Sequence, residues 1–561
     1  MTSTVNENVN VPYISRRSAI YGTEYMVAST QPLASQAGVR ILEQGGNAAD
    51  AAVAVAAALG VTEPFSTGVG GDCFCLFYCA QDKTVHGVNG SGRAPQALTI
   101  ERLKNEFGVG EDNEEVPARS VHAITVPGAV AGWVDTVERF GSGGMTLEAV
   151  LAPAVVLADE GFPVGELTSP FWRDGAGLLQ TASPNGHELL IDGEGPQPGQ
   201  IFRNAAMAHT LRLVADGGKR GFYEGPVADA IINSVRQCGG VLAHSDLRNH
   251  QSSFEEPVSI EYQGYRLHEC APNASGLAAL LALGLVDELE RQRAVGSVAD
   301  MGHNSAKYLH LVIEALRLAF ADARRHVCDP DFGDVPVERL LSKEYLKMRA
   351  AAFDPGCAAA DVEAGAPLGG SDTIYFTVVD AEGNACSFVN SLFHDFGTGI
   401  VPRGCGFALH DRGSLFRLDP AHANSLEPGK RPYHTIIPAM VTVGGDLAMS
   451  YGIMGRYNQP QAHLQVLLNI VRFGMNPQAA LDVPRISIQV ESGRIAVEEG
   501  IDEATVAELR RLGHNVYVQT GIQRSVFGRG QIIRQLIDSR TGKRVLVGGS
   551  DPRSDGQAIG R

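Results

Sequence analysis

The sequence predicts a mixed, layered α/β fold with a large share of antiparallel sheet. Short apolar segments with strand character come in neighbouring pairs, residues 73–78 with 84–89 and residues 373–379 with 385–392. Longer segments that carry apolar residues at three- and four-residue spacing indicate helices between these pairs. Since strands and helices do not alternate regularly, an antiparallel arrangement is favoured over a parallel sheet built from βαβ units.

The first part of the chain opens with a helical region at residues 31–59. A glycine pair, Gly45-Gly46, interrupts it, and Asn47 is well suited to cap the alanine-rich helix that follows. The turn at residues 68–71 is rich in glycine and precedes the first strand pair. It lacks the spacing of phosphate-binding loops, so we interpret it as a turn with positive φ angles. Further helices are expected at residues 147–160, 277–293 and 308–327.

The length and composition limit the kinds of function that the chain can have. At 561 residues the chain exceeds a usual single core, so two or more lobes or one large layered domain are expected. Its 46 basic and 63 acidic residues give a net charge of −17, which argues against nucleic-acid binding. The longest apolar stretch, residues 48–61, contains Asp50 and is shorter than the roughly 18–20 residues of a membrane span. We therefore expect neither a nucleic-acid nor a membrane partner.

Two further observations concern location and chemistry. Glu24 interrupts the apolar core that a secretion signal would need after Arg16-Arg17, so a cytoplasmic location is expected. The nine cysteines are odd in number and scattered, which argues against a disulfide framework. Cys73, Cys75 and Cys79 would share one face of a strand, and we interpret them as buried thiols, with a metal or redox site as the alternative. Because the 16 histidines show no ligand spacing and no zinc motif occurs, we expect neither a metal nor a cofactor.

The most informative feature lies where the character of the chain changes, near residue 355. Glycine- and proline-containing segments at 354–356 and 365–370 predict a flexible linker that leads to Asp372. Thr373 follows at the start of a strand, as self-cleaving N-terminal nucleophile enzymes require. Its hydroxyl would attack the preceding carbonyl, and the freed α-amine, with a pKa of about 7.7–8.0, would then serve as the general base. A threonine that opens a strand is also simply a good strand former, so the pattern alone leaves both interpretations open.

The segment around Thr373 resembles the processing site of the γ-glutamyltranspeptidase family. Further segments match the family in the same order, from about residue 22 to the C-terminus, which makes the resemblance specific. The matching motifs include Gly45-Gly46-Asn47-Ala48-Ala49-Asp50-Ala51, Gly68-Val69-Gly70-Gly71, Pro272-Asn273-Ala274-Ser275-Gly276, Gly370-Ser371-Asp372-Thr373, Phe396-Gly397-Thr398-Gly399-Ile400, Pro428-Gly429-Lys430-Arg431-Pro432 and Ala480-Leu481-Asp482-Val483-Pro484-Arg485.

The resemblance implies a proenzyme with the four-layer αββα sandwich of the N-terminal nucleophile hydrolases. Cleavage before Thr373 would yield a large subunit, residues 1–372, and a small subunit, residues 373–561, that together form one intertwined domain. Ser391 matches a family threonine that hydrogen-bonds the nucleophile. Gly455 matches the first glycine of the pair whose backbone N–H groups form the oxyanion hole, and Arg456 replaces the second.

The positions that hold the γ-glutamyl substrate depart from the family pattern. Phe393, Arg412 and Leu415 replace the residues that bind the α-ammonium group, so a buried ammonium would lack a partner. On the carboxylate side, Ser91 stands where the family has an arginine, and Arg93 is a candidate to take over.

A histidine and a threonine, His434-Thr435, replace the serine pair that helps to hold the same carboxylate. His434 is either a substrate ligand or a hydrogen-bonded structural histidine. Arginine suits carboxylate recognition, so Arg93, Arg412 and Arg456 are expected to converge on the acyl group, with solvated surface positions as the alternative.

These observations predict a self-processed amidohydrolase or acyltransferase that cleaves the amide of a small acyl group, acidic or neutral, through an acyl-enzyme on Thr373. Its partners would be a small-molecule amide and its own cleaved subunit, and further dimerisation is left open. One alternative is a true γ-glutamyltransferase or glutathione hydrolase with a rearranged pocket. Another is an uncleaved, inactive binding protein, which Arg456 in the oxyanion turn favours.

Overall fold

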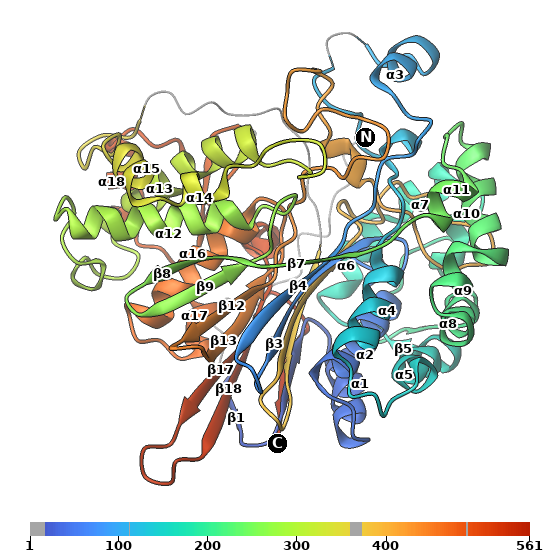
Figure 1. Cartoon of the computed structure of the whole chain (residues 1–561), viewed down its shortest axis with the longest axis horizontal. Coiled ribbons are helices and arrows are strands. Elements are labelled where there is room, and N and C mark those ends of the chain that lie inside the picture. Colours follow the sequence, from blue (N-terminus) through green and yellow to red (C-terminus); the bar gives the residue numbers. More distant parts are fainter. Residues whose placement is uncertain (1–16, 111–112, 360–372, 490–491) are drawn as a thin grey trace.

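Two seven-stranded antiparallel sheets lie face to face at the centre of the molecule, and helices cover both outer faces (Figure 1). The structure is a computed structural model that describes residues 17–110, 113–359, 373–489 and 492–561. Its four-layer αββα architecture confirms both the mixed fold that the sequence pattern predicts and the fold that the resemblance implies.

The first sheet carries the strand that begins beside Thr373. Its strands, in spatial order, are β19 (Gln557–Gly560), β2 (Met26–Ser29), β10 (Ile374–Val379), β11 (Ala385–Ser391), β3 (Asp72–Cys79), β4 (Thr84–Gly90) and β7 (Ser253–Glu255). The strands of the second sheet, in spatial order, are β1 (Ile20–Gly22), β18 (Arg544–Ser550), β17 (Gly530–Ile537), β13 (Asp446–Ile453), β12 (Ala439–Val443), β9 (Tyr265–Glu269) and β8 (Val258–Tyr262).

The two sheets pack through apolar side chains from both inner faces, and β10 and β11 contact β13 and β17 across this interface. The side chains that fill it include those of Met26, Phe74, Tyr375, Met440 and Ile533. Each sheet combines strands that precede and follow residue 372, so the two segments that cleavage would separate are interleaved.

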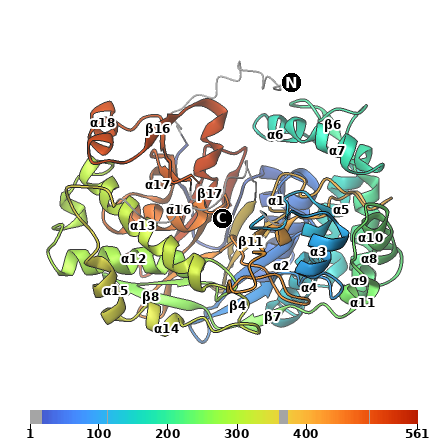
Figure 2. The same cartoon turned by 90° about the horizontal axis from the view of Figure 1, so that it is seen from above.

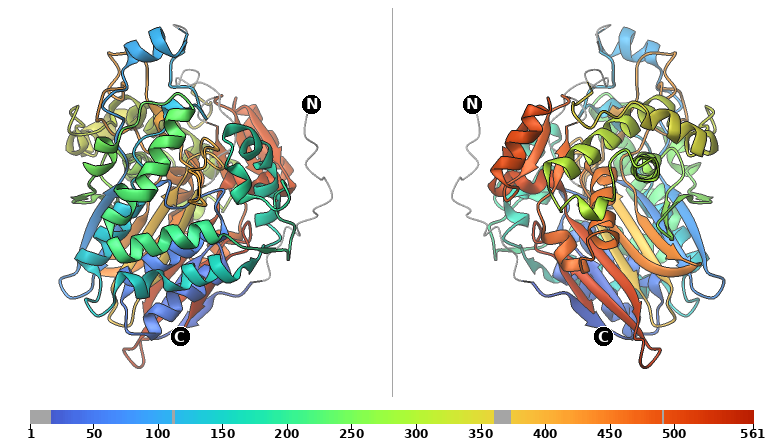
Figure 3. Two further views of the ribbon diagram at one scale, coloured as in Figure 1. Left: turned by 90° about the vertical axis from the view of Figure 1, so that its right-hand side faces the viewer. Right: turned by 90° about the vertical axis from the view of Figure 1, so that its left-hand side faces the viewer.

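Helices form the outer layers, as the views from above and from the two sides show (Figures 2 and 3). Those on the side of the first sheet are α1 (Pro32–Glu43), α2 (Ala48–Thr62), α4 (Ala129–Phe140), α5 (Leu147–Glu160), α8 (Ala205–Gly217), α9 (Lys219–Tyr223) and α10 (Gly225–Gln237). Those on the side of the second sheet are α12 (Gly276–Arg291), α13 (Ala306–His326), α15 (Lys343–Ala350), α16 (Asn458–Val471), α17 (Pro477–Asp482) and α18 (Glu503–Arg511).

Smaller elements complete the described parts of the chain. The short helices are α3 (Ile100–Glu106), α6 (Thr168–Asp174), α7 (Ala176–Ala182), α11 (His244–Arg248) and α14 (Val337–Leu340). The minor strands are β14 (Ile486–Ile488), β15 (Ile495–Glu498) and β16 (Val516–Gln519) in one sheet, and β5 (Phe162–Pro163) and β6 (Ile201–Phe202) in another.

The alanine-rich helix α2 is buried along its whole length between the first sheet and α1, α4 and α5. Helices α1 and α2 approach each other closely. A Cβ on Gly38 of α1 would come within 2.6 Å of the Val55 side chain of α2. Asn47 caps the helix as predicted, and Asp50 completes a capping box.

The predicted strand pairs and helices are confirmed within a few residues. All nine cysteines are free, and Cys73 and Cys75 are buried as expected, whereas Cys79 is partly exposed. The linker residues 360–372, including Asp372, lie outside the described residues. No helix in the described segments is both long and apolar enough to cross a membrane.

Candidate active site

The antiparallel hairpin β10–β11 brings the predicted nucleophile and its partner together. Ile374 pairs with Asn390 in the hairpin register, so the next residues outward, Thr373 and Ser391, face each other at its open end. The Thr373 Oγ1 and Ser391 Oγ atoms are 2.9 Å apart, and both residues are buried. Strand pairing therefore fixes the distance between the two hydroxyl groups.

Two donors point at the Ser391 hydroxyl. Phe393 N–H donates to its oxygen at 2.9 Å, and Arg412 Nη2 donates at 3.1 Å. The turn that aims the Phe393 N–H holds this residue at a φ of 78°, a conformation that bulky residues rarely adopt. A hydroxyl oxygen has two acceptor positions, and these two donors fix the position of the Ser391 oxygen beside Thr373 Oγ1.

Arg412 connects this pair to the surrounding charges. It opens a short 3₁₀ helix, Arg412–Leu415, and is fully buried. Its Nη1 donates to Thr435 Oγ1 at 2.9 Å, and its guanidinium carbon lies 4.3 Å from the centre of the Phe393 ring. Burial lowers the pKa of Arg412 to about 10, against the opposing effect of Asp72 and other nearby acids, so the side chain remains a cation at neutral pH.

Asp72, the first residue of β3, supplies the nearest negative charge. Its carboxylate lies 3.0 Å from His434 Nε2, 3.5 Å from His410 Nδ1 and 3.9 Å from Arg412 Nε. Although burial alone would raise the pKa of Asp72, His410, His434 and Arg412 together hold it well below its usual range. Burial and the Arg412 cation lower the pKa of His434 to about 3, so this histidine is neutral. Its Nε2 atom is hydrogen-bonded to Asp72.

A second buried pair lies behind Phe393. His394 Nδ1 is 2.6 Å from Asp411 Oδ2, and the Arg119 N–H donates to the same oxygen at 3.1 Å. Burial opposes ionisation of Asp411, but His394 and backbone donors lower its pKa to about 2. The His394 ring packs edge-on against Phe393 at 4.5 Å between ring centres. This pair fixes the backbone on both sides of the Ser391–Arg412 contact.

The turn between β13 and α16 carries the predicted oxyanion residues. Gly455 has a φ of 123°, which strongly favours glycine, and Arg456 follows at 47°. The Arg456 guanidinium carbon lies 4.9 Å from the centre of the Phe393 ring. Phe393 thus contacts two cationic groups, from Arg412 and from Arg456.

The structure brings several of the predicted site residues into direct contact, whereas Arg93 has other partners. Arg93 pairs with Asp329 and Asp331, at 3.2 and 2.7 Å, and lines a pocket of about 830 Å³ with Arg431 and other residues. The predicted residues that share direct contacts are Thr373, Ser391, Phe393, Arg412, Thr435 and Arg456.

The residues that sequence reasoning missed are Asp72, His394, His410 and Asp411. Asp72 comes from a different part of the chain than its partners, so no local pattern indicated it. The polar triplet His410-Asp411-Arg412 follows the apolar Leu409, and all three of its members are buried. Consecutive buried polar residues must be paired, so this triplet was the available signal for a polar network.

Comparison with known proteins assigns the chain to a family. A family model described as gamma-glutamyltranspeptidase matches residues 34–561. The chain belongs to the γ-glutamyltranspeptidase family. It is therefore an enzyme of the N-terminal nucleophile hydrolase type.

Two relatives and one solved structure resemble the chain over almost its full length. The Glutathione hydrolase-like YwrD proenzyme of Bacillus subtilis is 37% identical, with 97% of this chain and 99% of that protein covered. The Oxamate amidohydrolase proenzyme of Klebsiella pneumoniae is 32% identical, with the same shares covered. The crystal structure of cephalosporin acylase from Bacillus halodurans is 39% identical, with a TM-score of 0.87 and 98% of both chains covered.

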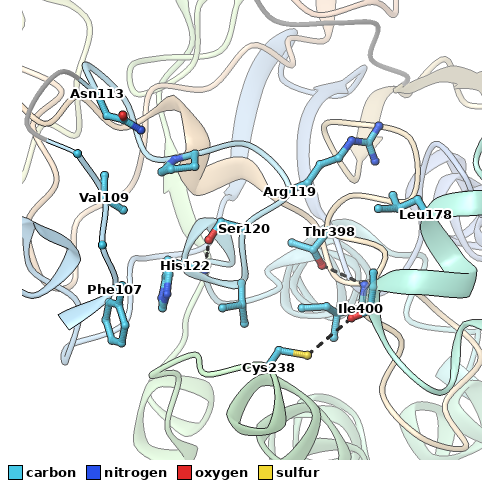
Figure 4. Close-up of a pocket in the computed structure, with 15 residues that line it drawn as sticks. Phe107, Val109, Asn113, Arg119, Ser120, His122, Leu178, Cys238, Thr398 and Ile400 are labelled. Atoms are coloured by element: carbon cyan, nitrogen blue, oxygen red, sulfur yellow. Dashed lines mark hydrogen bonds between the residues drawn. The ribbon is translucent and has the colours of Figure 1, made fainter. Parts of the chain in front are cut away.

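This family member also has a pocket of about 610 Å³ beside the candidate site (Figure 4). Arg119, His122, Thr398 and Ile400 are among the residues that line it, whereas Thr373 is not. Arg119 connects the pocket to the site, because its backbone N–H donates to Asp411. In the described residues, therefore, this hollow reaches the supporting network and not the nucleophile itself.

Proposed function

We propose that this member of the γ-glutamyltranspeptidase family is a self-processing amidohydrolase with Thr373 as its nucleophile. The observation that carries the proposal is the 2.9 Å contact between Thr373 Oγ1 and Ser391 Oγ at the start of a central strand. Both groups are buried beside the Arg412 cation and the Asp72 carboxylate. Perturbed, buried polar groups of this kind are typical of active sites.

Processing and turnover would use the same hydroxyl. In processing, Thr373 Oγ1 attacks the carbonyl carbon of residue 372, and the peptide nitrogen leaves with a proton to become the new α-amine. Water then hydrolyses the resulting ester and releases the carboxyl end of the large subunit. In turnover, the α-amine accepts the Thr373 hydroxyl proton while the oxygen attacks the substrate amide, and the amine product leaves protonated. Water hydrolyses the acyl-enzyme in the last step.

Ser391 and Arg412 would support both reactions. The Ser391 hydroxyl is hydrogen-bonded to Thr373 Oγ1 and would hold it in one orientation, since Phe393 and Arg412 donate to Ser391 and fix its position. As negative charge develops on Thr373 Oγ1, the Arg412 cation strengthens this hydrogen bond through Ser391. Arg412 therefore acts on the nucleophile through Ser391, as a positioning residue.

The acyl group would lack an α-ammonium. Phe393 stands where the resemblance expects an ammonium ligand, and guanidinium groups lie 4.3 and 4.9 Å from its ring centre. An ammonium brought to this ring would meet two like charges and no acceptor, whereas a carboxylate or a neutral group would meet neither penalty. The 32% identical relative named for oxamate amidohydrolase activity supports a short acidic acyl group.

The test uses two substrates that differ in one group. Glutaryl anilide and γ-glutamyl anilide share every atom except the α-ammonium, so their kcat/KM ratio isolates the effect of that charge. We expect the glutaryl compound to be preferred by about tenfold or more, since sites without the required polar partner discriminate strongly. Oxamate serves as the shorter acidic amide.

The alternative functions give different results in the same experiment. Preference for γ-glutamyl anilide would favour the transferase or glutathione hydrolase reading, which the 37% identical glutathione hydrolase-like relative suggests. A single uncleaved band near 59.5 kDa, without activity on any amide, would favour the inactive binding protein.

A further inference from the structure

A second group of buried polar side chains lies far from Thr373 in the sequence. His310 and Glu314 are four residues apart on α13 and therefore share one face of that helix. His514 follows α18 and faces them from the C-terminal part of the chain. One nitrogen of each histidine and one oxygen of Glu314 lie within 4.8 Å of one another, and all three residues are buried.

Hydrogen bonds fix the protonation of the two rings. His310 Nε2 lies 2.8 Å from the carbonyl oxygen of Asp354, so this nitrogen carries the proton and Nδ1 has a lone pair. His514 Nε2 lies 2.7 Å from His310 Nδ1 and must donate to it. The lone pair of a neutral His514 ring is therefore on Nδ1.

This leaves an electrostatic mismatch. Within the described parts of the chain, His514 Nδ1 is buried and has no hydrogen-bond partner, and a charged atom, Glu314 Oε1, lies 4.0 Å away. A lone pair and a carboxylate oxygen thus face each other with no donor between them. A cation between the two atoms would satisfy both.

The surrounding contacts hold the three groups in place. Arg317 Nη1 donates to Glu314 Oε1 at 2.9 Å, and the Ala359 N–H donates to Oε2 at 3.1 Å. The Asp354 carbonyl orients His310 in the same way. Such outer contacts fix the tautomer of a ligand histidine and the orientation of a ligand carboxylate.

We propose that His310, Glu314 and His514 bind a divalent transition metal ion of the zinc class. Two imidazoles and one carboxylate are a typical zinc ligand set, whereas calcium and magnesium prefer oxygen ligands alone. Zinc ligands lie about 2.0–2.2 Å from the metal, so tetrahedral ligand atoms are about 3.3 Å apart. The ligand atoms would be Nδ1 of each histidine and a Glu314 oxygen. The 2.7 Å contact between His514 Nε2 and His310 Nδ1 would have to open to make the His310 lone pair available, and because both Nδ1 atoms are already unprotonated, no ring proton needs to be released.

The metal would join three segments of the chain. His310 and Glu314 belong to residues before 372, and His514 to residues after it. Asp354 and Ala359 bond to the cluster directly, and the Ala358 N–H donates to Leu512 O at 2.7 Å. The ion would therefore hold the last described part of the large subunit against the small one. This bridging role rests on the proposed cleavage before Thr373, whereas metal binding itself does not.

Zinc retention tests the proposal. Wild-type protein and the Thr373→Ala variant are equilibrated with zinc chloride, dialysed against metal-free buffer and analysed for bound zinc by mass spectrometry. We expect a stoichiometric amount in both, and at least roughly 100-fold weaker binding in His514→Gln and in Glu314→Gln. His303→Gln is the matched control, since His303 bonds to Asn469 outside the cluster. Circular dichroism establishes that each variant is folded.

Cobalt gives a second, spectroscopic readout, because tetrahedral cobalt bound by nitrogen absorbs visible light. This absorption should appear with wild-type protein and His303→Gln and be missing in folded His514→Gln or Glu314→Gln. Wild-type protein that retains no zinc, or cluster variants that retain as much as wild type, would overturn the proposal. Zinc binding by Thr373→Ala separates this result from any failure of the proposed self-cleavage.

Discussion

At the scale of single residues, the candidate site depends on Ser391 more than on any other supporting group. It receives hydrogen bonds from Phe393 and Arg412 and lies 2.9 Å from Thr373 Oγ1. A hydroxyl in this position orients the nucleophile and passes on the influence of a buried cation. An alanine would keep the strand and remove both effects.

Ser391→Ala should therefore slow self-processing and amide hydrolysis by roughly 10–1000-fold, which corresponds to the loss of a few kcal/mol of positioning. Fragment formation followed by gel and kcat on the best substrate are the two measurements. Ser387→Ala on the same strand is the control, because Ser387 bonds to Tyr375 and Ala439 rather than to Thr373. Wild-type rates in Ser391→Ala would remove this residue from the site.

Arg456 is the residue-scale test of acyl selection. Arg412→Ala would slow the hydrolysis of every substrate, since Arg412 also donates to Ser391. Arg456→Gly removes the second cation beside Phe393 and restores the glycine of the family pattern. Glycine also tolerates the φ of 47° at this position, so the folded state should not lose stability from backbone strain.

We expect Arg456→Gly to narrow the preference for glutaryl over γ-glutamyl anilide several-fold, as one of two like charges is removed. The ratio of kcat/KM values for the two anilides measures this effect. Arg266→Ala, which removes an exposed arginine paired with Glu261, is the control for net charge. An unchanged ratio in Arg456→Gly would place its side chain outside acyl recognition.

At the scale of elements, the sequence pattern was sufficient for the strands and helices but not for the network between them. β10, β11, α5 and α12 were predicted because apolar spacing and turn residues are local properties. The hairpin register that sets Thr373 opposite Ser391 comes from the structure, since the sequence predicted only the two strands and took Ser391 from the family resemblance.

The contacts of Arg412 could not be predicted in this way. Asp72 on β3, His434 before β12 and the Arg412 helix meet only because three distant segments converge. Alignment to a family predicted Arg412 as a substrate ligand, since the family position has that role. Its complete burial and its bonds to Ser391 and Thr435 come from packing, which a single sequence does not contain.

At the scale of the whole molecule, buried histidines link stability to pH. Burial lowers the pKa of His434 to about 3, of His250 to about 3 and of His268 to about 4. In the unfolded chain the same groups titrate near about 6.5. Between these values the unfolded state binds protons that the folded state does not, so falling pH favours unfolding.

The melting temperature should therefore be steady from pH 8 to 7 and fall from pH 6.5 toward pH 4. Each such histidine contributes about 1.4 kcal/mol per pH unit in this window. Thermal scans at one heating rate across this range measure the slope. His268→Gln removes one titrating group, whose ring otherwise bonds to Thr442, and should make the slope shallower. A flat profile from pH 7 to 5 would contradict neutral, buried histidines.

The interleaving of the two sheets makes self-cleavage the decisive whole-molecule prediction. Each sheet contains strands from both sides of residue 372, so the two products should remain associated after the chain is cut. Purified wild-type protein should run as two fragments under denaturing conditions and as one species in native size-exclusion chromatography. Thr373→Ala removes the attacking hydroxyl and should give one intact, inactive chain near 59.5 kDa. Thr377→Ala, in the same strand, is the control and should still be cut, because Thr377 bonds to Ser450 and not to Ser391.

If the Thr373→Ala chain were cut at the same bond, an external protease would be the cause. Thr373 would then be left with a role in turnover alone.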